Sequence, residues 1–323
     1  MRWTGSIGRS RVADPVTLLA LGIDAAVGWP PGVYRRVGHP VGGFARLIGW
    51  CERRWNDHRR SDLARRMLGL ATVIILIGAT GMLALLLDHA MRAVLGSWWW
   101  IGTALLAWPA SAQRSLYDHV RPVAAALESG DLPAAQRAVA MIVGRDVETL
   151  DEPGITRAAI ESLAESFCDG VVAPLFWLLL LGLPGAWAYK AINTADSLIG
   201  HREERWRAFG WAAARIDDVA NWLPARIAGV LICLAGAGGW AVLWRDSGRH
   251  ASPNAGWPEA AMAGVLGVAL AGPVAYDGTM LDKPWIGAGG RDPPPHDLRR
   301  ALAVYLRACA LLWLIAGGVA WVR

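Results

Sequence analysis

The sequence predicts an all-α fold: a polytopic integral membrane helical bundle with roughly five spans, some segments of which are re-entrant or interfacial. Of its 323 residues, 54% are hydrophobic and only 18% are charged, whereas soluble domains carry about 25% charged residues. Several uncharged runs reach the roughly 20 residues that cross a bilayer. No alternating pattern predicts a strand. We therefore expect one membrane domain over residues 1–323.

The expected spans follow one another along the chain, and tryptophans near the ends of several of them fit an interfacial aromatic belt. Weaker candidates either contain charges or are short. The strong candidates are residues 68–87, 93–113, 170–189 and 227–244, and the weaker ones are residues 15–33, 260–276 and 301–322.

The charge distribution predicts the topology. Nine arginines lie between Arg35 and Arg66, directly before the 68–87 run, and the positive-inside rule places that loop in the cytoplasm. Basic residues also flank the 170–189 run on both sides, so a full crossing conflicts with the rule. Pro174 and a Gly-Leu-Pro-Gly turn at 182–185 predict that this run enters the membrane and returns. We expect a multi-pass protein of the bacterial inner membrane, with its site facing the cytoplasm.

The polar connections are expected to be helices and ordered loops. Residues 118–160 predict a cytosolic helical hairpin within the domain, in which one helix ends at Gly130 and Asp131 caps the next. Pro153 is expected to break the chain before a further helix that begins near Ile155. Stretches rich in Pro, Gly and Asn predict ordered loops at residues 245–258 and 283–297.

The most informative motif is a ladder of carboxylates. Glu161, Glu165 and Asp169 recur every four residues, which stacks them on one helix face. An uncharged run follows at once, and like charges beside hydrocarbon are costly unless a cation neutralises them. We interpret all three as candidate catalytic residues, and Glu161 and Glu165 also as ligands for Mg²⁺, which prefers carboxylate oxygens. The alternative is a solvated helix face paired with Arg157.

A second polar segment, residues 190–207, places amides and acids beside basic residues. Asn193 and Asp196 share a helix face, and arginine makes bidentate contacts with phosphate. Ordinary ion pairing within a helix is the alternative for the arginines. Asp196 is also a candidate metal ligand. The candidate substrate-binding residues are Asn193, Asp196, Ser197, His201, Arg202 and Arg205.

A third segment, residues 215–226, lies directly before an apolar run, where buried polar groups are usually functional. We interpret Asp217 as a metal ligand and Asp218 as catalytic. A turn at residues 250–259 adds further polar groups. The substrate-binding candidates from these two segments are Asn221, Arg226 and Asn254.

Other motifs are missing from the sequence. It has no Walker-type glycine loop, so ATP would have to bind in a non-standard way. The four cysteines form no close pair that predicts a zinc site or a disulfide framework. The arginine-rich stretch is explained by the membrane rule, and we expect no nucleic-acid partner.

These segments together resemble one family, the membrane-bound adenosylcobinamide-phosphate synthases of cobalamin biosynthesis (CobD/CbiB type). The resemblance extends over residues 38–287, and some positions depart from the family pattern, among them Trp29, Ser166 and His201. The matching stretches read GHPV, RLIG, GRD, LDEPGITRAAIESLAE, DGVVAPLFW, AINTADSLIGHREERW, FGWAAARIDDVANWLPAR, SPNAGWPEAAMAG and PWIG.

The resemblance implies an ATP-dependent, Mg²⁺-requiring amide ligase. Such an enzyme joins adenosylcobyric acid to aminopropanol phosphate, or a related amino alcohol, to give adenosylcobinamide phosphate. It implies a corrinoid substrate, an amino-alcohol phosphate, membrane lipid and other cobalamin-assembly enzymes as partners. Two alternatives stay open on the residues alone: an intramembrane Mg²⁺-dependent prenyl- or alcohol-phosphate transferase, and a non-catalytic membrane sensor.

Overall fold

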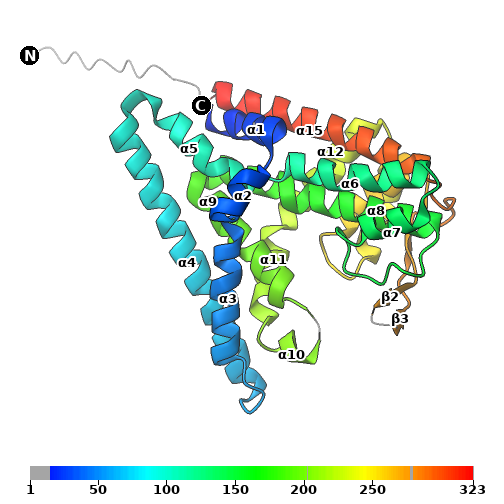
Figure 1. Ribbon diagram of the computed structural model, residues 1–323, viewed down its shortest axis with the longest axis horizontal. Helices are drawn as coiled ribbons and strands as arrows, with labels where there is room; N and C mark the ends of the chain where they lie inside the picture. Colours follow the sequence, from blue (N-terminus) through cyan, green and yellow to red (C-terminus); the bar gives the residue numbers. More distant parts are fainter. Residues whose placement is uncertain (1–14, 202, 277–278, 323) are drawn as a thin grey trace, which may run out of the picture.

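The computed structural model describes residues 15–201, 203–276 and 279–322, and helices dominate it, as predicted (Figure 1). The longest straight helix, α4 (Asp62–Leu95), runs obliquely along one side of the molecule, and α3 (Val41–Trp55) lies beside it. In its first half the chain forms α1 (Val16–Val27), α2 (Pro31–Val37), α3 (Val41–Trp55), α4 (Asp62–Leu95), η1 (Gly96–Trp98), α5 (Trp99–Ala107), η2 (Trp108–Ala110), α6 (Gln113–Glu128) and α7 (Leu132–Val139).

The second half packs across these helices, and α15 returns the C-terminus to the neighbourhood of α1 (Figure 1). Its elements are α8 (Glu152–Phe167), the π-helical turn η3 (Cys168–Val172), α9 (Ala173–Ile199), α10 (Glu204–Arg207), α11 (Trp211–Ala220), α12 (Trp222–Gly236), α13 (Trp240–Asp246), η4 (Ser247–Arg249), α14 (Gly256–Leu266), β1 (Leu270–Ala271), β2 (Val274–Tyr276), β3 (Thr279–Leu281), β4 (Trp285–Ile286) and α15 (His296–Val322).

Three helical stretches in the described residues are long and apolar enough to cross a membrane, or four if the bent pair α11–α12 is one span. The expected run at 68–87 lies inside α4, whose 34 residues extend about 51 Å, well beyond a bilayer core of about 30 Å. The count is below the roughly five expected because several apolar runs are broken into short helices.

The expected span at residues 93–113 is one such case. The chain turns at Gly96, which has a positive φ of 52°, and α5 then packs back on α4. A Cβ on Gly102 would lie 2.6 Å from the sulfur of Met91, so this glycine allows the close approach of the two helices. The nine residues of α5 reach only about 13.5 Å. They form an apolar hairpin with α4 instead of a separate span.

The predicted re-entrant turn is present in α9. Gly182 has φ 67° and ψ −157°, which interrupts the helix and reverses the chain. The Nδ2 atom of Asn193 lies 3.2 Å from Oδ2 of Asp169, 24 residues earlier. A straight helix would separate these residues by about 36 Å. The 170–189 run therefore forms two antiparallel half-helices and brings both of its ends to one place.

No strand was predicted, but the described residues contain four short ones. Two short antiparallel ladders pair β1 with β4 and β2 with β3, and each strand has only two or three residues. Such strands are too short to show an alternating pattern. The weak candidate span at 260–276 is also wrong, because α14 ends at Leu266 and the chain continues into β1 and β2. The loop expected at 283–297 contains β4, and the one at 245–258 contains η4.

The predicted hairpin forms α6 and α7, and Asp131 caps α7 by accepting a hydrogen bond from the Ala134 N–H at 2.9 Å. The following helix begins earlier than predicted, at Glu152. Asp151 is its N-cap, and Pro153 lies in its first turn, where a proline costs no hydrogen bond. Leucine, valine and alanine side chains of α6, α8, α12, α14 and α15 form the largest hydrophobic core.

We predict that Gly182→Ala destabilises the protein, because a Cβ at this φ and ψ is strained by about 1–3 kcal/mol. The melting temperature in detergent should fall by about 2–10 °C. Gly78→Ala in α4 is the matched control. A Cβ there meets nothing within 4 Å, so this variant should melt at or slightly above the temperature of the unmodified protein. Equal melting temperatures for the two variants would contradict the left-handed backbone conformation of Gly182.

Candidate active site

The carboxylate ladder does not lie on one regular helix. Glu161 and Glu165 lie one turn apart on α8, but Asp169 falls in the π-helical turn η3. A π turn inserts an extra residue into the helical period and is often found at functional sites. The loosened backbone leaves the Gly170 carbonyl to accept a hydrogen bond from the Ala112 N–H at 2.9 Å. The turn thus joins this segment to the start of α6, while Asp169 still lines a cavity together with Glu165.

Asp169 is the start of a hydrogen-bonded network that joins η3, α9 and α11. Asn193 donates to Asp169 at 3.2 Å and to Asp217 at 3.5 Å. Asn221 donates to Asp217 at 3.0 Å and accepts from the Tyr189 hydroxyl at 2.9 Å. Asp217 and Asn221 are buried. The structure therefore brings together predicted residues of three separate segments.

Glu161 is buried and held by two donors. Its Oε2 is 2.5 Å from Nη2 of Arg145, and its Oε1 accepts from the Ala271 N–H at 2.7 Å. The alternative of a solvated ladder paired with Arg157 is therefore wrong for this residue. Arg157 pairs with Asp292 and stacks over Trp285, 4.7 Å from its ring centroid.

Three cavities that share lining residues surround these acids. The Arg145 cavity, about 280 Å³, lies between α8, α14 and the loop after α7. The Asp169 cavity, about 470 Å³, is lined by α6, α8 and α9, and the wide cavity, about 1040 Å³, lies between α2, α3 and α6. Glu165 lines both the Arg145 and the Asp169 cavities, and Lys190 and His119 line both the Asp169 and the wide cavities. The acids therefore lie where neighbouring cavities share their walls, and we call this row of three cavities the path.

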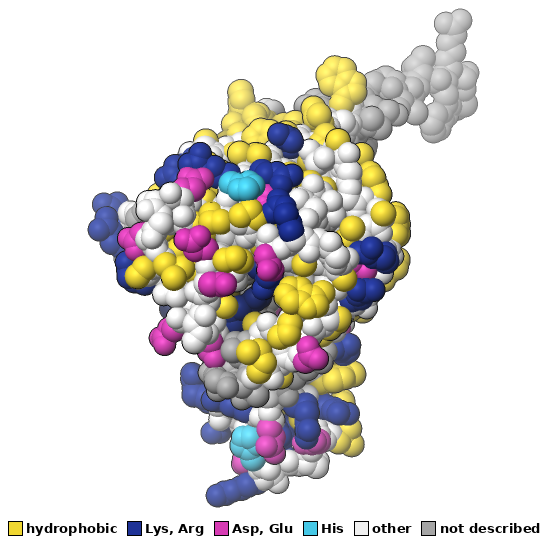
Figure 2. All heavy atoms as spheres, turned by 90° about the vertical axis from the view of Figure 1, so that its right-hand side faces the viewer, with side chains coloured by type: hydrophobic (Ala, Val, Ile, Leu, Met, Phe, Trp, Pro, Cys, Tyr) yellow, Lys and Arg dark blue, Asp and Glu magenta, His cyan; other side chains and the backbone are white. Residues whose placement is uncertain are grey.

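The Arg145 cavity mixes opposite charges. Its basic groups are Arg145, His250 and Lys283, and its acids are Glu161, Glu165 and Glu259. Burial, together with the charges of Glu161 and Glu165, raises the pKa of Glu259 well above its ordinary value. Figure 2 shows acidic and basic side chains close together on the end of the molecule formed by α7 and the β2–β3 hairpin. The cavity is suited to a ligand that carries both anionic groups and a cation.

His119 stands between the Asp169 and wide cavities in a defined tautomer. Its Nδ1 is 2.7 Å from the Ser115 carbonyl oxygen, one turn earlier on α6. A carbonyl only accepts, so Nδ1 carries the proton of this bond. In the neutral ring Nε2 is then left as an acceptor.

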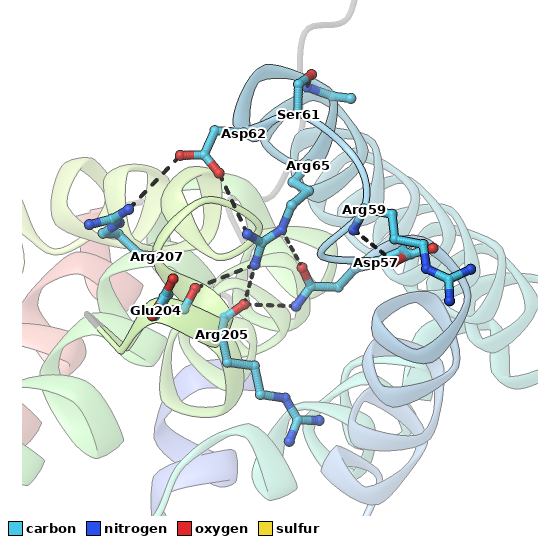
Figure 3. A network of polar contacts seen from close by, with 10 residues as sticks. Asp57, Arg59, Ser61, Asp62, Arg65, Glu204, Arg205 and Arg207 are labelled. Atoms are coloured by element: carbon cyan, nitrogen blue, oxygen red, sulfur yellow. Dashed lines mark hydrogen bonds and ion pairs between the residues drawn. The ribbon is translucent and has the colours of Figure 1, made fainter.

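Two predicted substrate-binding residues, Arg205 and His201, line none of the three cavities. Arg205 pairs with Glu52 at 2.8 Å. Its carbonyl accepts from Arg65 at 2.6 Å (Figure 3) and from Asn56 at 2.9 Å. These contacts join α10 to the loop before α4, which accounts for Arg205 structurally. His201 is exposed and packs against Trp206. Arg202 lies outside the described residues.

Three more predicted residues form a neighbouring cluster that lines none of the three cavities. Arg226 donates to Oδ1 of Asn254 at 3.1 Å and stacks over Trp222 and Trp257. Asn254 in turn donates to the Asp218 carbonyl at 2.8 Å. The Asp218 carboxylate lies 2.9 Å from Arg215. These contacts fasten the turn before α14 to the start of α12.

The remaining predicted residues stay close to the network. Ser197 lines the Asp169 cavity and donates to the Asn193 carbonyl at 2.9 Å. Asp196, near the end of α9, is close enough to Asp169 and Asp218 for their charges to act on its carboxyl group. Among the residues the structure describes, no three His, Cys, Asp or Glu side chains are arranged to enclose a metal ion. Mg²⁺ needs fewer, since it commonly uses one or two carboxylates and completes its shell with phosphate and water.

Sequence reasoning missed several residues that line the path. Arg145, Lys283, His250 and Glu259 belong to the Arg145 cavity, and Lys190 borders the Asp169 cavity. Arg145 and Glu259 lie in stretches that carried the family resemblance, so a signal was present for these two residues. The convergence of the whole set from the α7–α8 loop, α14 and the β3–β4 connection was not visible, because it depends on how distant segments pack.

The fold and this site define a helical membrane protein with a charged path at the ends of its apolar helices. A family model described as "CobD/Cbib protein" matches residues 17–305. Cobalamin biosynthesis protein CobD of Rhodobacter capsulatus is 51% identical over 94% of this chain and 96% of its own length. The proteins of the same name from a Sinorhizobium species (46% identical, 92% and 95% covered) and Brucella anthropi (45%, 91% and 93%) are also similar.

No solved structure matches this chain. The family model covers most of the sequence, and the relatives are similar over nearly their whole length. The chain belongs to the CobD/CbiB family.

We predict that Glu259→Gln stabilises the protein, and more so at pH 8 than at pH 5. The folded-state pKa of Glu259 is raised above its unfolded value, so the unfolded state releases its proton first as the pH rises. The free energy of unfolding is therefore lowered progressively above pH of about 4.5. Glutamine removes this loss. Melting temperatures in metal-free buffer test the idea, and a gap between the two proteins that narrows with rising pH would refute it.

Proposed function

We propose that this chain is an ATP-dependent amide ligase of cobalamin biosynthesis. It joins the free propionate of adenosylcobyric acid to aminopropanol phosphate, or a related amino alcohol, to give adenosylcobinamide phosphate. Membership of the CobD/CbiB family and the printed names of its relatives support the pathway. They favour it over a prenyl-phosphate transferase or a membrane sensor. The observation that carries the reaction type is the position of Glu165, between a mixed-charge cavity and the Asp169 network.

The Arg145 cavity suits the polyphosphate of ATP. Arg145 and Lys283 supply positive charge, and His250, Glu165 and Glu259 also line the cavity. Phosphates bound there need both cationic side chains and a divalent ion to neutralise them. No Walker loop is required for such an arrangement, because side chains take over the role of the loop's N–H groups.

Glu165 and Asp169 are the acids best placed to hold Mg²⁺. The oxygens of Glu161 already accept from Arg145 and Ala271, and those of Asp217 accept from Asn193 and Asn221. Bound Mg²⁺ would withdraw charge from the phosphates that are transferred. In this role Glu161 orients Arg145, and Asp217 orients the amides that hold Asp169.

The chemistry then needs two steps. A propionate oxygen attacks the terminal phosphorus of ATP and ADP leaves, which gives an acyl phosphate. The amine nitrogen attacks the acyl carbon, the carbon–oxygen bond to phosphate breaks, and the amine gives up a proton. Nε2 of His119 is the acceptor we assign to that proton, because its tautomer is fixed by Ser115 and it lines the Asp169 cavity. Histidine is the commonest general base in enzymes.

The membrane setting fits a protein whose charged path lies where several apolar helices end. The loop before α4 and α10 touch where Asn56 and Arg65 both donate to the Arg205 carbonyl (Figure 3), which supports a topology with both basic loops on one side of the membrane. The positive-inside rule makes that side the cytoplasm, where ATP is available. We propose an inner-membrane location, and transfer of substrate or product to other cobalamin-assembly enzymes at its surface.

The proposed function predicts an amide product when purified protein receives adenosylcobyric acid, aminopropanol phosphate and Mg-ATP, detected by mass. Removal of Mg²⁺ with a chelator should abolish it. Glu165→Gln should lower turnover at least about tenfold, because it removes a charge beside the transferred phosphates. Glu152→Gln, on the same helix but outside the three cavities, is the matched control. Absence of product with every amine donor tried would sink the ligase assignment.

His119→Asn should slow amide formation by about 100-fold, since general bases typically contribute 100- to 10,000-fold. Asparagine can still donate to the Ser115 carbonyl but offers no acceptor in place of Nε2. The reaction with hydroxylamine, whose nitrogen is already unprotonated near neutral pH, should be affected much less. Ser115→Ala keeps the backbone carbonyl and should retain nearly full rate. Equal losses with both nucleophiles would show that His119 only positions the substrate.

A further inference from the structure

A fourth cavity lies at the far end of the apolar helices from the carboxylates. Its volume is about 230 Å³, and it lies between α4, α5 and the turn of α9 at Gly182, beside the first turn of α1 and the end of α15 (Figure 1). Asp169 and Asn193 mark the two ends of the re-entrant segment, whereas the tip of that segment lines this cavity. It shares no lining residue with the three cavities of the path. The groups assigned to the proposed reaction therefore do not account for it.

Arg92, on α4, is the one basic side chain that lines this cavity. Its guanidinium is fixed on two sides, since Nε donates to Oδ2 of Asp88 at 2.8 Å and the ζ carbon lies 3.6 Å from the ring centroid of Trp99. Thr103 holds Asp88 in turn by donating to Oδ1 at 2.7 Å. Nη1 and Nη2 of Arg92 make no hydrogen bond to any residue that the structure describes. Two oriented donors are thus left for a ligand, in the geometry that binds two oxygens of a phosphate.

The position of Arg92 along α4 is that of a lipid headgroup. The uncharged residues 68–87 rise about 30 Å, which equals the thickness of a hydrocarbon core, and Asp88 follows directly. Three consecutive tryptophans at 98–100 also mark an interface. Arg92 is the only lysine or arginine among residues 67–113. It lies at the membrane face opposite the arginine-rich loop before α4, where the positive-inside rule disfavours a basic residue, so a local reason is needed for it.

The other walls of the cavity are largely apolar. Leu85 of α4 and Leu179 and Leu183 of α9 line it. Leu181, which also lines it, and Leu86, next to Leu85 on α4, are more than half exposed and face the surrounding lipid. An inorganic anion gains nothing from these leucines, whereas the glycerol and first acyl carbons of a phospholipid would bury apolar surface against them. The leucines and the guanidinium together suit an amphiphile whose anionic group is a phosphate.

We propose that this cavity is a binding site for one membrane phospholipid, whose phosphate accepts hydrogen bonds from Nη1 and Nη2 of Arg92. Its acyl chains lie along the exposed leucines of α4 and of the α9 turn. The bound headgroup bridges the α4–α5 hairpin to the tip of the re-entrant segment, and so stabilises the reversal at Gly182. The site needs neither ATP nor a corrinoid, and it is independent of the proposed function.

The test is a titration of the delipidated full-length protein, in detergent, with dioleoylphosphatidylglycerol. Native mass spectrometry counts the lipids retained, and the melting temperature reports binding to the folded state, because such a ligand stabilises it. The unmodified protein should retain a single lipid and melt at a higher temperature when it is bound. Arg92→Gln should weaken binding at least about tenfold, since it removes the charged pair of donors.

Arg66→Gln is the matched control for Arg92→Gln. Arg66 lies on the same helix at the opposite interface, is exposed, and stacks over Trp211 with its ζ carbon 5.9 Å from the ring centroid. It lines neither this cavity nor those of the path. Its replacement should leave retention of the single lipid unchanged, because any lipid that it contacts belongs to the exchangeable layer around the protein.

A second pair of variants tests the cavity without touching its charges. Leu85 and Leu86 are adjacent, exposed residues of α4, and only Leu85 lines the cavity. Tryptophan is tolerated near a membrane interface. Leu85→Trp should fill the space and weaken lipid binding at least about tenfold by steric conflict, whereas Leu86→Trp should bind as the unmodified protein does.

The remaining arms identify what the site binds. Dioleoylglycerol, which lacks the phosphate, and inorganic phosphate, which lacks the chains, should each leave the melting temperature unchanged. Stabilisation by inorganic phosphate equal to that by the phospholipid would assign the site to a soluble anion and overturn the inference. Equal lipid retention by the unmodified protein and Arg92→Gln would also overturn it. Should Arg92→Gln not fold, as judged by its melting temperature, the Leu85 and Leu86 pair decides the question.

Discussion

The contact between Asp169 and Asn193 holds the site together. It joins the π-helical turn after α8 to the returning half of α9, two points that are 24 residues apart in the chain and 3.2 Å apart in space. The reversal at Gly182 makes this contact possible. Without it, Asn193 and Lys190 would lie at the far end of a continuous helix. The site is therefore built from both ends of one apolar segment.

Polar groups placed this deep need partners, and the network supplies them in an ordered way. Asp217, Asn221 and Tyr189 satisfy one another behind Asp169, while Arg145 and the Ala271 N–H satisfy Glu161. Burying a charge without such compensation costs several kcal/mol. As a consequence, the fully bonded acids fix the geometry, whereas Glu165 lines two cavities. A row of equivalent acids in the sequence thus becomes a set with different roles.

Many polar side chains outside the three cavities fix neighbouring helices and loops against one another. Arg205 and Arg65 join the loop before α4 to α10 (Figure 3), and Arg226 stacks between two tryptophans while it bonds to Asn254. In the sequence these arginines had the same appearance as phosphate ligands. Arginine serves both purposes through the same planar set of donors, so residue type and spacing could not distinguish them. Their partners do.

The sequence by itself determined the helical membrane class, the re-entrant turn and three of the polar segments that form the site. The length of the uncharged runs, the positions of the arginines and the Gly-Leu-Pro-Gly turn are local signals. Each can be recognised in a short stretch of sequence without knowledge of the fold. Only the tertiary structure decided that Asp169 lies in a π turn and bonds to Asn193, that Arg145, Lys283 and Glu259 line a cavity with Glu165, and that Trp29 lines a wide cavity. These features depend on which distant helices pack together. That packing minimises exposed apolar surface and unsatisfied polar groups over the whole chain at once, so no single segment specifies it.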